Sequence, residues 1–184
     1  GLSIPFPIRD VYHHHLPKEK ADEPLRRLAA YMKSLPTLAM VSDDVLEEVA
    51  GEASLGHFGR GESAIVQEQE NVKVHFVLAG SAIALCQDAS GRNHTIADLS
   101  RGDFFGYSGL LANEPSPMTV TAIEDMEVLI LEIKAVQKIL NTSPRLAQQL
   151  GAVIDARQSK LKALNPVEKR GKGILSSSGP SLTL

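Results

Sequence analysis

The residues with the clearest chemical potential lie between positions 102 and 122. Gly102 and Gly106 bracket two phenylalanines, and the segment that follows can form little more than one helical turn before Pro115 and Pro117 interrupt it. A short helix that begins after a glycine presents unpaired backbone N–H groups at the positive end of its dipole. This arrangement predicts a site for an anion.

The same residues resemble the phosphate-binding cassette of the cyclic nucleotide-binding domain family. The usual form of that cassette is Phe-Gly-Glu, two residues, Leu-Leu, a short loop, then Pro-Arg, two small residues and Thr-Val. The positions that match this form are Phe105, Gly106, Leu110, Leu111, Glu114, Pro115, Thr119, Val120 and Ala122. The resemblance implies that a cyclic nucleotide or another small anion would meet Phe105, Gly106, Tyr107, Ser108, Gly109, Leu110, Ser116, Pro117, Met118 and Thr119.

Three positions depart from the family's chemistry. The ribose-binding glutamate of the family falls at Tyr107, and the arginine that pairs with the cyclic phosphate falls at Ser116. The next residue, whose backbone N–H the family also uses, is Pro117, which has no N–H to donate. Losing the ionic partner of a partly buried phosphate should cost about 2 to 5 kcal/mol, or about 30-fold to several thousand-fold in affinity. We therefore expect weak or lost binding of cAMP and cGMP.

The resemblance also suggests how a ligand would be held and how the domain would respond. An anion would meet the N–H groups around Gly106, Ser108 and Gly109 and the hydroxyl of Thr119, and a base would stack under a C-terminal helix near residues 154–161. The side chains that could replace the missing arginine are Arg60, Arg92 and Arg101. Closing of the C-terminal helix would then bias an N-terminal helix.

Two other readings of the cassette stay open. Tyr107 could fill the ribose space and leave a vestigial pocket, in which case the domain would serve as an oligomerisation or partner-docking module without a small ligand. Alternatively, the loss of the arginine could adapt the pocket to a neutral or less charged molecule. An open pocket with a bound anion would favour a sensor, and a collapsed cassette would favour a docking module.

The elements that would position the cassette can be read from the hydrophobic pattern. Residues 24–35 have apolar side chains at helical spacing, with Pro24 at the start and Pro36 at the end. A second helix should begin after Ser42, with Asp43 and Asp44 in its first turn. From residue 53 to 133 the period becomes two, with frequent turn signals. The strands expected there are residues 53–58, 63–66, 73–79, 81–87, 94–99, 119–122 and 126–133.

Two helices should follow the strands. Residues 134–141 form a short one, and Ser143 with Pro144 begins a longer one. The apolar face of this longer helix is expected to comprise Leu146, Leu150, Val153, Ile154, Leu161 and Leu164. The fold class is therefore α+β, an antiparallel β-sandwich or jelly-roll flanked by N-terminal and C-terminal helices. The expected domain covers residues 21–164, and residues 165–184 read as a disordered tail.

Residues 4–12 resemble the last strand of the cytoplasmic domain of small-conductance mechanosensitive channels, which ends in a similar Pro-aromatic-Pro and Asp-Val pattern. Fusions of that domain to a cyclic nucleotide-type domain form a recognised bacterial channel family. The resemblance implies that residues 1–20 are a stub of a preceding channel domain. The fragment, itself soluble, would then be a regulatory domain on the cytoplasmic side of the bacterial inner membrane and a homo-oligomer in the full-length protein.

The sequence offers little to other function classes. The formal net charge of -3 and the pI of about 6.1 leave no basic field for nucleic acid, and no helix-turn-helix pattern follows the last helix. His57, His75 and His94 stand singly, and no nucleophile elbow, Walker loop or dinucleotide fingerprint is present. Cys86 reads as a small buried apolar residue. We expect no enzyme activity, no catalytic residue, no metal site and no cofactor.

Overall fold

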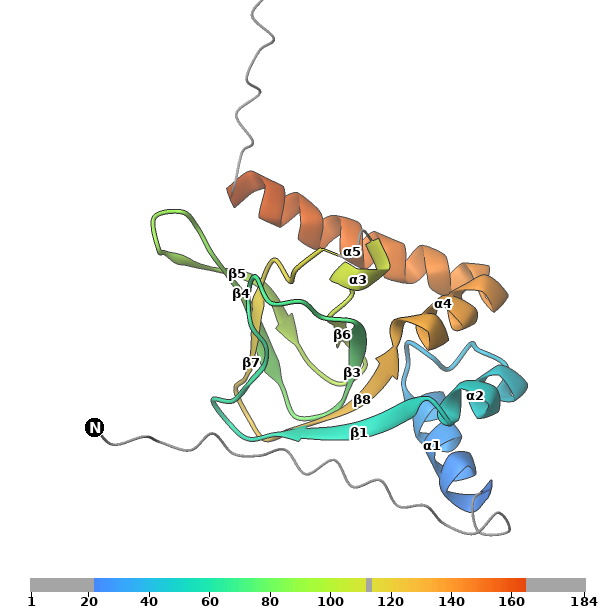
Figure 1. Ribbon diagram of the computed structural model, residues 1–184. Helices are drawn as coiled ribbons and strands as arrows, with labels where there is room; N and C mark the ends of the chain where they lie inside the picture. The colour runs from blue at the N-terminus through green and yellow to red at the C-terminus, as the bar shows by residue number, and fades with distance from the viewer. Residues whose placement is uncertain (1–21, 112–113, 165–184) are drawn as a thin grey trace, which may run out of the picture.

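The computed structural model describes residues 22–111 and 114–164 (Figure 1). The predicted stub at residues 1–20, the channel-like segment at residues 4–12 and the predicted tail at residues 165–184 lie outside the described residues.

Two helices open the described chain, α1 (Asp22–Ser34) and α2 (Asp43–Ala50). Both correspond to helices that the sequence predicts, over residues 24–35 and after Ser42, although α1 begins two residues before Pro24. Ser42 has the extended backbone of an N-cap residue and its carbonyl accepts the Leu46 N–H at 3.1 Å, but its side chain makes no capping hydrogen bond. The two helices pack against each other and bury one face each, with Met32, Leu46 and Val49 at 0 or 1 % exposure.

Two four-stranded antiparallel sheets form the centre of the fold, in the orders β1-β8-β3-β6 and β2-β7-β4-β5. The strands are β1 (Ala53–Phe58), β2 (Ser63–Ile65), β3 (Lys73–Ala79), β4 (Ala82–Gln87), β5 (Asn93–Leu99), β6 (Phe104–Phe105), β7 (Thr119–Ala122) and β8 (Met126–Glu132). Seven of them lie within one residue of the predicted strands at each end, and the two-residue β6 was not predicted as a strand. The predicted antiparallel sandwich with flanking helices is confirmed.

The strand β3 departs from simple alternation because five consecutive residues, from Val74 to Leu78, are all buried. A strand alternates only when one of its faces meets water. β3 is an inner strand of its sheet and also contacts the helix α4 (Ile133–Thr142), so both of its faces are covered. The two-residue strand β6 pairs with this buried strand.

The remaining helices are the short α3 (Ser108–Leu111) and the long α5 (Pro144–Leu164), which crosses the top of the sandwich above α3 (Figure 1). The Ala147 N–H donates to the Ser143 carbonyl at 3.0 Å, as expected for a helix that starts at Pro144. The buried residues of α5 are Leu146, Leu150, Ile154 and Arg157.

The prediction that Val153 belongs to the apolar face of α5 is wrong, since Val153 is 38 % exposed. The buried stripe advances by four, four and three residues, a spacing that keeps its members on one side of the helix. Val153 precedes Ile154 by one position and so projects from the flank of that stripe.

The helices at the two ends of the described chain contact each other. α2 packs against α4, and the Lys138 ammonium on α4 forms an ion pair with Glu48 on α2. α3 also contacts α4. Within residues 22–111 and 114–164, no helix is long and apolar enough to span a membrane, and no cluster of three or more His, Cys, Asp or Glu side chains could hold a metal ion.

Candidate functional site

The backbone of the cassette is set by β6 and by the glycine that follows it. β6 pairs with β3 so that Phe105 lies opposite His75, and the rings of these two residues stack at 4.8 Å. Gly106 has φ +83°, and a Cβ at this position would lie 2.5 Å from the Lys73 carbonyl oxygen. Only glycine fits this turn, because the conformation is left-handed and the space is already filled by backbone.

Asn71 fixes this turn from outside the cassette. Its side-chain amide nitrogen donates to the Gly106 carbonyl and to the Lys73 carbonyl, both at 2.6 Å. The amide thus joins the start of β3 to the end of β6 across 35 positions of sequence. Sequence reasoning missed Asn71, and no pattern around it distinguishes it from an ordinary loop asparagine.

Tyr107, at the position of the family's glutamate, is buried at 3 % exposure. Its ring packs against Phe104 with centroids 5.7 Å apart, and its hydroxyl has no hydrogen-bond partner in the part of the chain that the structure describes. Burial raises the pKa of the Tyr107 hydroxyl, and the positive charge of Arg157 offsets part of the rise. The position therefore presents an aromatic ring in place of a carboxylate acceptor.

Ser116, at the position of the family's arginine, points inward and is 4 % exposed. Its hydroxyl donates to the Met118 carbonyl at 2.7 Å. Its backbone N–H donates to Gln69 at 2.9 Å, and its carbonyl accepts the Glu68 N–H at 2.7 Å. These bonds tie the loop before β7 to the segment after β2, and the Ser116 hydroxyl is engaged within its own loop.

The other predicted cassette residues lie in the same two segments. Phe105 and Met118 are buried, and Leu110 and Pro117 are half-buried. The Thr119 hydroxyl accepts the Gln67 N–H at 3.0 Å. Gly109 lies within α3. Ser108 is buried, and among the described residues its hydroxyl has no hydrogen-bond partner.

None of the three arginines expected to replace the missing cation contacts the cassette. Arg92 lies beside Asp88, with 3.4 Å between Nε and the carboxylate, and Arg101 reaches Ser34 on α1. The Arg60 backbone N–H donates to Asp125. The expectation is wrong because all three belong to turns whose side chains face outward, and Arg60, Arg92 and Arg101 are exposed.

The cation that does reach the cassette is Arg157 on α5. One terminal nitrogen of its guanidinium donates to the Phe104 carbonyl at 2.5 Å, and the guanidinium carbon lies 5.2 Å from the Phe104 ring centroid and 5.9 Å from that of Tyr107. Sequence reasoning missed Arg157 because it followed apolar residues only. The available signal was its position, three residues after Ile154 and four before Leu161 on the buried stripe.

A groove of about 480 Å³ lies next to Arg157, between β5 and α5. Its lining residues are Ile96, Ala97, Asp98, Ala152, Val153, Ala156, Arg157 and Lys160. Lys160 spans one end of the groove, since its ammonium donates to the Ile96 carbonyl at 2.9 Å. The groove overlaps the region near residues 154–161 where a base was expected to stack.

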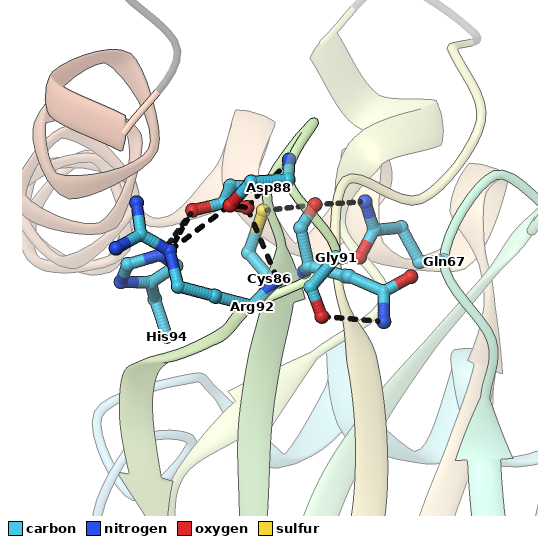
Figure 2. A network of polar contacts seen from close by, with 8 residues as sticks. Gln67, Cys86, Asp88, Gly91, Arg92 and His94 are labelled. Carbon is cyan, nitrogen blue, oxygen red and sulfur yellow. Dashed lines mark hydrogen bonds and ion pairs between the residues drawn. The ribbon is translucent and has the colours of Figure 1, made fainter.

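A polar network holds the turn between β4 and β5 (Figure 2). The Asp88 carboxylate accepts from the Ser90 hydroxyl and backbone N–H at 2.5 and 2.8 Å, and it lies 2.7 Å from the His94 ring nitrogen. These hydrogen bonds and one from the Arg92 N–H hold the pKa of Asp88 well below its usual range. Cys86 is buried beside this network, and burial raises the pKa of its thiol. The network stabilises the hairpin formed by β4 and β5.

The comparison with protein families matches residues 55–143 to the cyclic nucleotide-binding domain. A cAMP-dependent protein kinase regulatory subunit from Mycosarcoma maydis is 31 % identical over 100 residues, which are 53 % of this chain and 19 % of that protein. The chain thus spans about a fifth of the length of this relative.

Solved structures of the same kind share the fold. A regulatory subunit of a cAMP-independent protein kinase A from Trypanosoma cruzi, bound to guanosine, has a TM-score of 0.69 at 17 % identity, over 80 % of this chain and 53 % of that one. A triple mutant of the Trypanosoma brucei regulatory subunit, with one threonine changed to arginine, is bound to cAMP and has a TM-score of 0.67 at 19 % identity, over 78 % and 54 %.

Proposed function

We propose that this chain, which has the fold of a cyclic nucleotide-binding domain and matches that family over residues 55–143, is a regulatory domain whose cassette binds cAMP and cGMP weakly or not at all. The observation that carries the proposal is the inward direction of Ser116, whose hydroxyl is committed to the Met118 carbonyl. A phosphate at the cassette would find neither a cation nor a free hydroxyl at this position.

The electrostatic argument extends to the neighbours of Ser116. Pro117 has no N–H to donate, and the Thr119 hydroxyl, which accepts the Gln67 N–H, has one O–H left that could donate to an anion but carries no charge. The guanidinium of Arg157, which does reach the cassette, is already engaged by the Phe104 carbonyl and by the rings of Phe104 and Tyr107. An anion moved from water to the Ser116 side of the cassette would therefore lose its hydration without gaining a charged partner there. A missing ionic partner corresponds to about 2 to 5 kcal/mol, so affinity should fall by about 30-fold to several thousand-fold.

The ribose side of the site supports the same conclusion. A ribose hydroxyl needs an acceptor, whereas Tyr107 places here a buried ring that packs against both Phe104 and the guanidinium of Arg157. A ligand that entered here would have to move a side chain that is 3 % exposed. The site therefore lacks the usual recognition groups for both the phosphate and the ribose of a cyclic nucleotide.

The test is a calorimetric titration with cAMP and cGMP of the unaltered chain and of a variant with Tyr107→Glu, Ser116→Arg and Pro117→Ala. We expect the unaltered chain to give no heat at micromolar concentration and the variant to bind. A matched control is Ser54→Arg, which adds the same cation on the exposed strand β1. Micromolar binding by the unaltered chain would contradict the proposal.

A second function is a ligand-free module for oligomerisation or partner docking. It is favoured by the burial of Tyr107 and by the contact of Arg157 with the same ring, because together they fill the cassette from within. This second function predicts that the unaltered chain does not bind guanosine either, the neutral ligand of the Trypanosoma cruzi structure. Binding of guanosine without binding of cAMP would instead favour a pocket adapted to an uncharged ligand.

We further propose that the domain belongs to a bacterial channel of the small-conductance mechanosensitive type, on the cytoplasmic side of the inner membrane and in a homo-oligomer. The support is the resemblance of residues 4–12 to the end of a channel domain, in a segment outside the described residues. Sedimentation of the native full-length protein with the membrane fraction of its source cell, and its release only by detergent, is the expected result. Recovery in the supernatant would contradict this assignment.

A further inference from the structure

Arg157 is a charged side chain in an unusual position. It is 7 % exposed, and among residues 22–111 and 114–164 no carboxylate lies within ion-pair distance of it. Its contacts are the Phe104 carbonyl and the ring faces of Phe104 and Tyr107. Buried arginines are normally paired with acids, because removing an uncompensated charge from water is costly.

The contacts of Arg157 offset this cost in a specific way. A hydrogen bond from a charged donor to a carbonyl is among the stronger ones in proteins, and aromatic faces attract a cation most when water is excluded. Phe104 lies in β6 and Tyr107 lies directly before α3. One side chain of α5 therefore touches the cassette on both sides of the Gly106 turn.

The rest of α5 shows why this contact matters. The N-terminal half of the helix is anchored by Leu146 and Leu150, at 0 and 4 % exposure. Beyond Ile154, Arg157 is the last buried residue among those described in α5, and Leu161 and Leu164 are only partly buried. One flank of this half faces the groove with the small side chain of Ala156, and Ala152 continues this flank one turn earlier in the helix. The apolar contacts of this half are thus sparse.

We propose that Arg157 is a latch that holds the C-terminal half of α5 on the cassette and couples the position of that half to the Gly106 turn. A change at Phe104 or Tyr107 releases the helix beyond residue 154, and loss of the guanidinium releases the cassette. The latch depends on contacts within the chain, so it stands whether or not cyclic nucleotides bind.

Hydrogen exchange of the whole chain, followed by mass spectrometry, tests the latch with Arg157→Met, which keeps an apolar stem and removes the charge. We expect amides in residues 104–111 and 155–164 to exchange at least about tenfold faster, with residues 144–150 and β3 unchanged. Arg157→Lys keeps a cation with N–H donors, so the exchange rates of residues 104–111 and 155–164 in this variant should lie between those of the unaltered chain and those of Arg157→Met. Arg145→Met, the same replacement at an exposed position of α5, should leave all four segments unchanged.

The reciprocal variant is Tyr107→Leu, which removes one aromatic face and keeps an apolar side chain. Because coupling between two sites acts in both directions, residues 155–164 should exchange faster in this variant although the change lies in the cassette.

Unchanged exchange of residues 155–164 in Arg157→Met would overturn the proposal. So would an equal acceleration of every segment, since that would indicate a general structural role. If Arg157→Met does not fold, Arg157→Lys decides: faster exchange confined to the same two segments supports the latch, and unchanged exchange there overturns it.

Discussion

Gly106 sets the backbone turn of the cassette, while the side chains at positions 107 and 116 are neither a carboxylate nor a cation. The turn is held by φ +83° and by the two hydrogen bonds from Asn71. Tyr107 and Ser116 both point into the protein, where one meets Arg157 and the other bonds its own loop. The backbone turn thus depends on Gly106 and Asn71, whereas the chemistry that the cassette offers depends on the side chains at positions 107 and 116.

Replacing Gly106 by Ala tests how firmly the turn is set. The methyl group would lie 2.5 Å from the Lys73 carbonyl in a left-handed backbone conformation, so the free energy of unfolding should fall by about 2 kcal/mol or more. Urea denaturation measures this change. Gly151→Ala is the control, because its helical position has nothing within 4 Å and alanine there should add about 0.5 to 1 kcal/mol. Equal effects at the two sites would contradict the assignment.

Among the elements, the β4–β5 hairpin shows how a loop can be made rigid without a core. Asp88 accepts hydrogen bonds from Ser90 and Arg92, and its carboxylate lies against the ring of His94. Gln67 adds a reciprocal pair, since its side chain accepts the Gln87 N–H at 2.8 Å and donates to the Gln87 carbonyl at 3.1 Å. These polar contacts fix the strand ends that support the groove beneath α5.

The Asp88 network makes the hairpin acid-sensitive. The pKa of Asp88 is lower in the folded chain than its ordinary value of 3.8, so its contribution to stability is present above about pH 4 and is lost as the pH falls through the folded pKa. The melting temperature of Asp88→Asn should therefore lie below that of the unaltered chain at pH 6, and the gap should narrow toward pH 2. Thermal melts across this range by circular dichroism provide the measurement. A gap that stays constant would mean that the carboxylate charge is not what holds the turn.

At the scale of the whole molecule, most of the fold could be predicted and most of the site geometry could not. Hydrophobic periodicity and proline positions were sufficient for α1, α2, α4, α5 and seven strands, because these signals are local. The identities at positions 107 and 116 were also visible in the sequence. Their inward orientation and the role of Arg157 depend on which surfaces meet across the fold, and Asn71 gave no local signal at all.

The hydrophobic pattern of the sequence predicts a single domain over residues 21–164, and this boundary can be tested. A fragment of residues 21–164 should unfold in one cooperative transition, with a free energy of unfolding within about 1 kcal/mol of the full chain, because the sequence predicts no part of the domain's core outside these residues. Parallel urea titrations of the two proteins would show this. A loss of several kcal/mol would mean that residues 1–20 or 165–184 pack on the domain.

The contact of α2 with α4, reinforced by the Lys138–Glu48 ion pair, connects the helices before and after the sheets directly, in addition to the contacts of α4 with β3 and β8. α3 rests on α4, α4 continues into α5 through Ser143, and α2 carries α1. A tilt of α5 would therefore displace α4, and α4 would displace α2 and the helix α1 that packs on it. A displacement of α5 would therefore reach α1 through α4 and α2, while the contacts of α4 with β3 and β8 and of α5 with β5 would transmit part of it to the sheets.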